Sequence, residues 1–331
     1  VDARNLLPSN GYSGKASTTG SSGGLIGINA TVSDVTNNSS VTSYIKSGTI
    51  LNITGDTVIL ADNRTRQLAL ADANSAGLVA AGISQADVTT NTYTHAYLGS
   101  NVDLTGGSLT ITTTGHDNSF ADTVSGSVGG ISVSAATADT TTDSSTVAEI
   151  QNGSEIDLTG SGSGDFKITA DHTSAFNGRI RALSGGLIGG SGADIDNLVT
   201  SDVIASVGDN VDVQARDVSV EAVNRASKKL SGANIDGEAY GIVAGGKADS
   251  ESIIDFTTLA TVGDNASLEV VGDITSPGDF KVKAYNDLDL RDKVNFTAGG
   301  GLSGLGAYST IETAHNLARV DIGDADLLSA G

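Results

Sequence analysis

Apolar and polar residues alternate along most of this chain. In the stretch VGDNVDVQARDVSVEAVN, from Val207 to Asn224, apolar residues occupy every second position on both sides of a polar corner. Such alternation places apolar side chains on one face of an extended strand and polar side chains on the other. The alternating pieces are rich in Val, Ile and Thr and are bounded by Gly, Asn, Asp and Ser, which predicts many short β-strands.

The alternating pattern is organised as a repeat. Each unit opens with an apolar, glycine-rich segment such as GLIGINATV, followed by a strand, a glycine turn and a second strand, as in YIKSGTILNITGDTVILADN. The units are 53 to 60 residues long, and this regularity indicates a repeat architecture. Their opening segments begin near Gly24, Gly77, Gly130, Gly186, Gly241 and Gly301.

The last strand of each unit ends on an asparagine or a histidine. Asparagine tolerates the left-handed backbone conformation of a sharp corner, and stacked asparagine side chains can hydrogen-bond to one another. We therefore expect these residues to stack at one corner of successive units. They are Asn63, His116, His172, Asn224 and Asn286.

Short strands that repeat without proline-rich linkers or bulky aromatic anchors favour a β-solenoid, in which each coil pairs with the coils before and after it. The sequence predicts an all-β fold, a right-handed parallel β-helix over residues 22–331 with about five and a half repeats. Residues 1–21 are either the tail of a preceding repeat or a flexible lead-in. A coil of about 20 residues would make each unit two or three coils, whereas one wide coil per unit is the alternative.

The strongly negative charge of the chain limits the classes of molecule that it can bind. Its 331 residues include 39 acidic and 18 basic side chains, a formal net charge of −21, and no Lys or Arg occurs between Arg66 and Lys167. This argues against direct binding to nucleic acid or to an anionic membrane. No apolar run approaches the roughly 18 residues of a membrane span, so no membrane span is predicted.

The composition of the chain indicates where the protein acts, and the identity of its first residue indicates how the chain was produced. The chain contains no Cys, Met or Trp, which excludes disulfides and thiolate metal sites. Secreted proteins avoid an unpaired thiol in an oxidising compartment, so this composition favours an extracellular or cell-surface location. Because Val1 is not Met, we expect an internal fragment or a processed product.

The repeats resemble those of a known family. The units GLIGINATVSDVTNNSSVTSYIKSGTILNITGDTVILAD and GLSGLGAYSTIETAHNLARVDIGDADLL, with the turns TSYIKSG, THAYLGS and ARVDIGD, look like the repeats of leukotoxin-type filamentous adhesins, relatives of the filamentous haemagglutinins. This resemblance implies a long, stiff, secreted bacterial surface filament, exported through an outer-membrane partner and acting in adhesion or in a matrix or biofilm. A host surface or a polysaccharide would be its ligand, and self-assembly or continuation into a longer filament would give it length.

An enzyme is the main alternative. A β-helix polysaccharide lyase, hydrolase or depolymerase needs carboxylates converging on one groove, and the pairs Asp287/Asp289 and Glu155/Asp157 lie two residues apart on one strand face. Alternate polar residues on a half-buried strand also face water without any catalytic role. Because every repeat carries such residues, the sequence predicts a non-enzymatic protein.

Calcium is the other alternative, as in a secreted calcium-binding repeat module. Carboxylates near tight turns offer oxygen ligands, although the spacing of an EF-hand is absent. We favour the interpretation that these carboxylates are solvated turn residues. No cofactor is expected, and weakly bound, stabilising Ca²⁺ is the one exception considered. His95 and His315 are expected to be surface residues without a ligand role. The candidate calcium ligands are Asp287, Asp289, Asp292, Asp321, Asp324 and Asp326.

Overall fold

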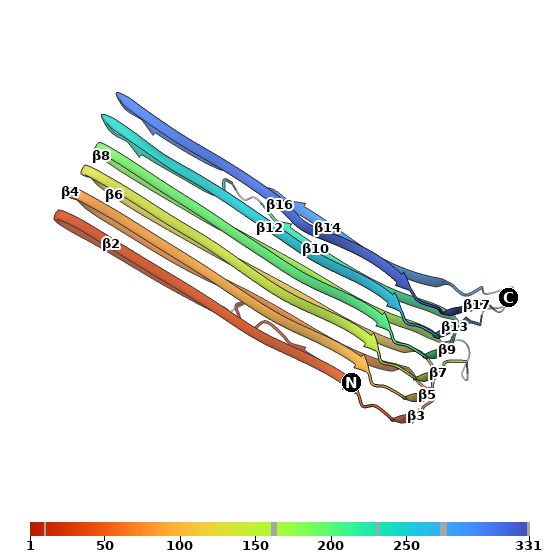
Figure 1. Ribbon diagram of the computed structural model, residues 1–331. Helices are drawn as coiled ribbons and strands as arrows, with labels where there is room; N and C mark the ends of the chain where they lie inside the picture. The colour runs from red at the N-terminus through yellow and green to blue at the C-terminus, as the bar shows by residue number, and fades with distance from the viewer. Residues whose placement is uncertain (10, 160–163, 230–231, 272–276, 330–331) are drawn as a thin grey trace.

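The described residues form a parallel β-solenoid of six coils. The computed structural model describes residues 1–9, 11–159, 164–229, 232–271 and 277–329, and every regular element in them is a β-strand. Figure 1 shows the coils stacked side by side along the solenoid axis. The first three coils contain β1 (Asp2–Asn5), β2 (Gly14–Ile45) and β3 (Ile50–Asn52); β4 (Thr57–Leu98) and β5 (Asp103–Thr105); β6 (Leu109–Ile150) and β7 (Glu155–Asp157).

The remaining three coils follow the same plan, with interruptions in the last two. Coil 4 contains β8 (Asp165–Val207) and β9 (Asp212–Ala215). Coil 5 contains β10 (Asp217–Lys228), β11 (Ile235–Tyr240), β12 (Val243–Val262) and β13 (Ser267–Val270). Coil 6 contains β14 (Phe280–Leu290), β15 (Val294–Gly299), β16 (Leu302–Ile322) and β17 (Asp326–Ser329).

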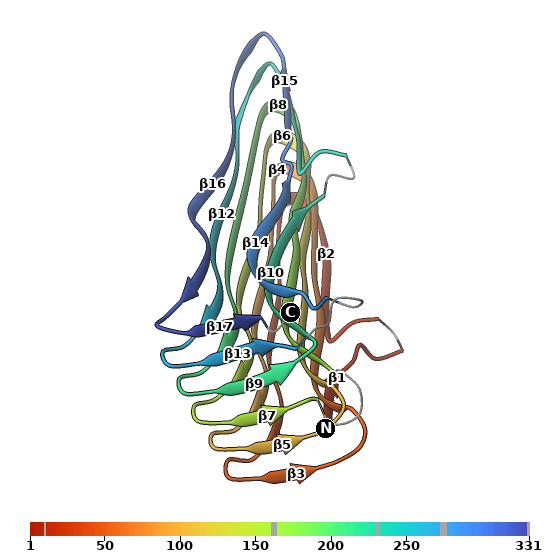
Figure 2. The ribbon, with the colours of Figure 1, turned by 90° about the vertical axis from the view of Figure 1, so that its right-hand side faces the viewer.

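Each coil has three unequal sides. A first arm runs from the base to a glycine turn, a second arm returns to the base, and one short strand closes the base (Figure 2). The two arms belong to one 11-stranded sheet that bends at the turn, which we call the apex. The short strands form a separate six-stranded sheet in the order β17-β13-β9-β7-β5-β3. The result is a wedge, narrow at the apex and broad at the base.

Each repeat is therefore one wide coil. This answers the question, left open by the sequence, of how many coils a repeat contains. Neighbouring repeats pair in parallel and in register, so Val220 lies between Ile168 and Val282. The strand segments within residues 1–21 belong to the first coil, because Asp2 pairs with Leu60 and Gly14 with Gln67.

Backbone pairing shifts two of the expected unit boundaries by one residue. Gly77 pairs with Gly129, so Gly130 lies one residue beyond the apex of coil 3. In coil 6 the apex glycine is Gly300 rather than Gly301, since Leu302 pairs with Val243.

The interior changes character from base to apex. Near the base it is packed with large aliphatic side chains such as Ile59, Leu98 and Leu104, which are fully buried. Near the apex it holds small residues such as Ala71 and Ala86. Small side chains let the arms approach closely and large ones hold them apart, which explains the wedge of Figure 2.

A polar band crosses the interior between these two regions. The buried carboxylate of Asp117 accepts hydrogen bonds from the hydroxyls of Thr65 at 2.7 Å, Thr92 at 2.8 Å and Ser144 at 2.6 Å. These residues come from both arms of the solenoid, so the band ties the arms together across the wedge. Buried polar groups are stable when they are hydrogen-bonded in this way.

The left-handed corner of the solenoid lies where the second arm meets the base strand. Asn101, Asn210 and Asn265 have φ angles of 54°, 55° and 54°, and Gly48 and Gly153 occupy the same corner with φ of 70° and 75°. Side-chain oxygens there accept hydrogen bonds from the next coil, as when the Asp264 N–H donates to Asp209 Oδ1 at 2.9 Å. The repeated SGT, GSN, NGS and GDN motifs are therefore corner motifs.

The predicted asparagine and histidine column differs from the structure in two respects. Asn63, His172, Asn224 and Asn286 do occupy equivalent positions, but Gly115 fills that position in coil 3 and His116 lies one residue beyond it. The error arises because coil 2 is one residue shorter in the backbone register than the 53-residue spacing suggested.

The same column lies inside the first arm rather than at a corner. Its side chains point inward and bond mainly across the wedge: Ser39 donates to Asn63 at 2.9 Å and Ser201 to Asn224 at 3.1 Å. His172 bonds to Thr146 at 3.0 Å, and burial lowers the pKa of its ring. The column therefore belongs to the polar band.

The corner gives a first testable prediction. Asn210→Ala is expected to lower the free energy of unfolding by about 1–2 kcal/mol, because Ala keeps the Cβ that crowds the following carbonyl oxygen in a left-handed backbone but loses the short polar side chain with which Asn offsets that crowding. Asn210→Gly relieves this crowding and should retain the stability of the unsubstituted protein. Urea unfolding followed by circular dichroism measures both; equal stability of the two variants would contradict the assignment.

Candidate binding surface

The outer face of the second arm carries a cluster of aromatic side chains near the base. Tyr44 on β2 stacks on Tyr97 on β4, with ring centroids 4.9 Å apart and planes 4° apart. His95 lies 4.6 Å from Tyr97, and Tyr93 meets His95 edge to face at 5.6 Å. Strand alternation explains the arrangement: Thr94 and its alternate neighbours point inward, so the aromatic residues point outward.

Hydrogen bonds fix the histidine within this aromatic cluster. His95 Nε2 lies 3.1 Å from Glu149 Oε1 on β6, and Tyr93 Oη lies 3.0 Å from His95 Nδ1. The bond from His95 lowers the pKa of Glu149, against the opposing effect of burial. With Nε2 donating to the carboxylate, Nδ1 of a neutral ring accepts from the tyrosine. His95 is thus a surface residue that is held in place as part of the cluster.

A shallow hollow of about 370 Å³ adjoins the ring of Tyr93. The residues that line it come from three coils, with Asn38, Asn91 and Asp143 in one register column and the serines Ser40 and Ser145 on either side of Tyr93 in the next. The Asn91 amide donates to Asn38 Oδ1 at 2.7 Å. An aromatic wall beside amide, hydroxyl and carboxylate groups suits a ligand that has both an apolar face and many hydroxyls.

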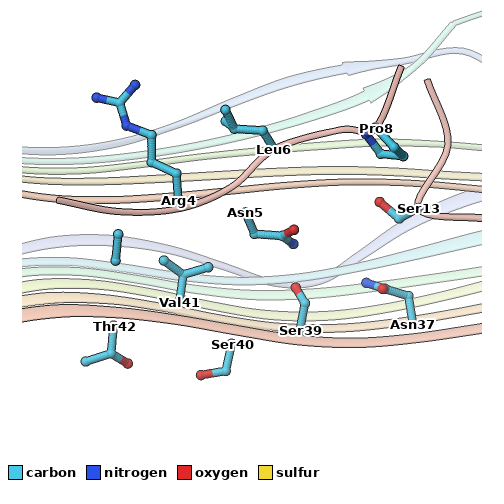
Figure 3. A pocket seen from close by; sticks show the side chains of 11 residues that line it. Arg4, Asn5, Leu6, Pro8, Ser13, Asn37, Ser39, Ser40, Val41 and Thr42 are labelled. Carbon is cyan, nitrogen blue, oxygen red and sulfur yellow. The ribbon is translucent and has the colours of Figure 1, made fainter. Parts of the chain in front are cut away.

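A larger hollow, about 750 Å³, opens at the end of coil 1. Figure 3 shows Asn5 facing Ser39 and Val41 across it, while Ser40 and Thr42 point away. Ser39 and Val41 pair with residues of coil 2 that are buried, Thr92 and Thr94. This hollow is therefore the open end of the solenoid interior, and we do not treat it as a candidate ligand-binding cleft.

A column of carboxylates runs along the outer face of the second arm, above the aromatic cluster. Asp34, Asp87 and Asp139 pair in register, the Asp196 N–H donates to Asp139 Oδ1 at 3.2 Å, and Glu251 pairs with Asp196. We call these five residues the acidic column. Burial, with the neighbouring carboxylates adding to it, raises the pKa of Asp139 to about 6.

The acidic column predicts a pH dependence of stability. Asp139 titrates near 3.8 when unperturbed and near 6 in the fold, so the folded state binds this proton more tightly. Its contribution favours folding at acid pH and is lost as the pH rises from about 4 to about 6. Asp139→Asn should therefore stabilise the protein at pH 7, by on the order of 1 kcal/mol after solvent screening.

Urea unfolding at pH 4, 5, 6 and 7 measures this effect. The gain from Asp139→Asn should be largest at pH 7 and vanish at pH 4. Asp103→Asn, at an exposed aspartate outside the column, is the matched control and should change stability little at any pH. A gain for Asp139→Asn that does not depend on pH would contradict the prediction.

The candidate calcium ligands do not converge. Asp287 and Asp289 point outward from β14, with Asp289 paired to Arg291 at 3.2 Å. Asp292 points inward and pairs with Lys228 at 2.9 Å. Asp321 pairs with Arg319, and Asp324 and Asp326 lie in the last base corner and base strand. Within the described ranges, no group of three or more His, Asp or Glu side chains is placed to hold a metal ion.

The carboxylate pairs weighed for catalysis occupy ordinary positions on their strands. Glu155 and Asp157 lie on the base strand β7, where the Asp157 carboxylate accepts a hydrogen bond from the Thr159 hydroxyl at 2.6 Å.

His315, the other histidine expected at the surface, lies on the exposed edge of coil 6, with its ring 3.5 Å from the Asp255 carboxylate.

Comparison with known proteins adds no relative. No protein family, curated protein or solved structure matches this chain. The likeness to filamentous adhesin repeats stays a prediction from the sequence. In the part of the chain that the structure describes, no helix is long and apolar enough to cross a membrane.

Proposed function

We propose that this chain is a structural, non-catalytic segment of a secreted bacterial surface filament, acting in adhesion or matrix formation. The observation that carries the proposal is the continuity of parallel pairing through all six coils. Coils 2 and 3, for example, pair from Thr57 and Leu109 at the base through the apex to Leu98 and Ile150. Repeated pairing of this kind gives stiffness without requiring any unique site.

The six coils form a broad blade (Figure 2), whereas the resemblance implies a long, stiff filament. Each coil adds about 4.8 Å along the axis, so six coils rise by roughly 30 Å. Each arm has about 20 residues and reaches roughly 65 Å from base to apex. A long filament on this plan needs many more coils in one chain or the stacking of separate chains.

The two end coils support such continuation. Among the described strands, β3 and β17 are the outer members of the base sheet, and β2 and β16 each pair on one side only. A strand edge with unpaired N–H and C=O groups is a template for a further strand. We therefore propose that a further coil, from the same chain or from another copy, covers each end.

Electron microscopy of the purified chain tests the proposal. Single particles should be blades roughly 65 Å long and roughly 30 Å thick, and at higher concentration they should stack along the thin dimension. Rounded particles without stacking, or turnover of polysaccharides by the purified chain, would count against a structural segment.

The aromatic cluster supports an adhesive role for the same segment. Tyr93 and the residues that line the neighbouring hollow offer a ring face together with hydrogen-bonding groups, which suits an uncharged polysaccharide. The carboxylates of Asp143 and Glu149 disfavour an anionic polysaccharide. We propose an uncharged glycan as the ligand of this face.

Affinity electrophoresis tests the glycan proposal with dextran as the neutral probe and alginate as the anionic one. Dextran should retard the unsubstituted chain and should not retard Tyr93→Ala. Tyr308→Ala, at an exposed tyrosine on coil 6, is the matched control and should be retarded normally. Retardation by alginate alone, or equal retardation of both variants, would refute this choice of ligand.

A further inference from the structure

The apex of the wedge exposes large aliphatic side chains in every coil. One register row just past the glycine turn consists of Ile26, Val79, Ile131, Ile188, Val243 and Leu302, which are between 39% and 70% exposed. Nothing in the turn requires apolar side chains at these outward positions, because the interior lies on the opposite face of the strand. We call this row and its outward neighbours the apex patch.

The apex patch extends down the outer face of the second arm in the first three coils. Ile28 and Val133, 65% and 49% exposed, lie one outward position beyond the row, and Ile83, 48% exposed, lies one outward position further on. Residues 24–33, 77–86 and 129–138 contain no charged side chain at all. Contiguous exposed apolar surface of this kind marks an interaction site in a soluble protein.

The positions of the charged residues around the apex patch limit the kinds of partner that can bind to it. The acidic column, from Asp34 to Glu251, borders the patch along its lower side, and the whole chain carries −21. An anionic membrane or nucleic acid placed over the patch would meet this column. A second copy of the chain can approach here because the patch is the broad uncharged part of this face.

We infer that the apex patch is the surface through which two copies of this chain associate side by side. The row repeats at the spacing of the coils, about 4.8 Å, and only a surface with the same period matches it along its whole length. A second copy has that period. Identical patches meeting about a two-fold axis form a closed, self-complementary interface.

The direction of the two-fold axis follows from the acidic column. An axis parallel to the strands would place the two columns face to face, whereas an axis parallel to the solenoid axis places them at opposite rims of the interface. In the second arrangement the bases point away from each other and the sheets pack about 10 Å apart. Like charges then stay apart and solvated, so we assign the second arrangement.

Sedimentation velocity tests the inference at low salt and in about 0.5 M NaCl, which screens the residual repulsion between acidic chains. The unsubstituted protein should form a dimer, and salt should tighten it. Replacing Ile28, Ile83 and Val133 by threonine should weaken the dimer at least about tenfold in Kd. Threonine keeps the β-branched shape and the strand preference of these exposed positions, and circular dichroism checks the fold.

A second triple variant is the matched control. Val58→Thr, Leu198→Thr and Val320→Thr change residues of 48%, 41% and 43% exposure outside the patch and should leave the dimer intact. A protein that stays monomeric in high salt would overturn the inference, and so would equal weakening by both triple variants. Binding of a monomer to phosphatidylcholine vesicles, lost in the patch variant only, would assign the patch to a lipid surface instead.

Discussion

Lys228→Met is expected to lower the free energy of unfolding of the last two coils by about 3–5 kcal/mol. Lys228 Nζ lies 2.9 Å from Asp292 Oδ1 and 2.9 Å from Ser252 Oγ, and both charged side chains are almost completely buried. Burial lowers the pKa of Lys228, while Asp292 opposes that shift. Removing the ammonium leaves the Asp292 carboxylate buried with the Ser309 hydroxyl as its remaining partner.

Hydrogen exchange locates this loss, because coils of a solenoid open locally. Amides of β14 and β16 should exchange faster in Lys228→Met, and amides of β4 and β6 should not change. Lys228→Met combined with Asp292→Leu should restore most of the stability, since no unpaired charge remains. Lys281→Met, which breaks an exposed pair with Glu221, should cost less than about 1 kcal/mol. A similar small cost for Lys228→Met would contradict the buried pair.

Gly186→Ala is expected to cost about 3 kcal/mol or more. A Cβ at Gly186 would lie 2.1 Å from the carbonyl oxygen of Gly129 in the preceding coil, and backbone cannot move aside as a flexible side chain does. Gly129 stands in the same relation to Gly77, and Gly300 to Gly241. The methyl group must therefore force two coils apart at the apex.

Gly185→Ala is the matched control for this substitution. It adds the same methyl group one residue earlier, where no atom lies within 4 Å of the new Cβ. Thermal unfolding should show a large fall in Tm for Gly186→Ala and almost none for Gly185→Ala. Similar Tm values for the two variants would mean that the coils do not meet through these glycines.

The close approach of apex glycines also explains what the sequence could predict. From the second coil on, a glycine recurs at each apex because a side chain there would collide with the preceding coil, so the repeat is visible in the order of residues alone. The alternation of Val218, Val220 and Ala222 predicted strands that do pair in register with coils 4 and 6. The alternation of apolar residues and the in-register pairing of the strands both result from the stacking of equivalent coils.

The number of coils per repeat could not be predicted in this way. The same two-residue alternation runs along both arms of β4 and changes phase only around the apex turn at Gly77, and interior positions hold Thr65, Gln67 and Thr90, which look like surface residues. They are buried because the two arms face each other closely and bond across the gap, as Thr90 does to Gln67 at 2.9 Å. Only the pairing of the arms reveals this.

The residues of the candidate binding surface are less easily recognised in the sequence than the repeat is. Tyr44 and Tyr97 occupy the same position of successive repeats, and YTHAY places Tyr93, His95 and Tyr97 on one strand face. The acidic column likewise repeats at the unit spacing. The calcium candidates were sought near turns instead, where Asp292 is in fact the buried partner of Lys228.

One distance tests most directly whether each repeat is a single wide coil. Thr42 on coil 1 and Arg319 on coil 6 lie in one register column through His95, Val147, Ile204 and Leu259. The chain has no cysteine, so Thr42→Cys with Arg319→Cys can carry two spin labels for a pulsed dipolar measurement. Five steps of about 4.8 Å predict a separation of roughly 24 Å. Two or three coils per repeat would place the labels roughly 50–70 Å apart, and such a distance would contradict the wide coil.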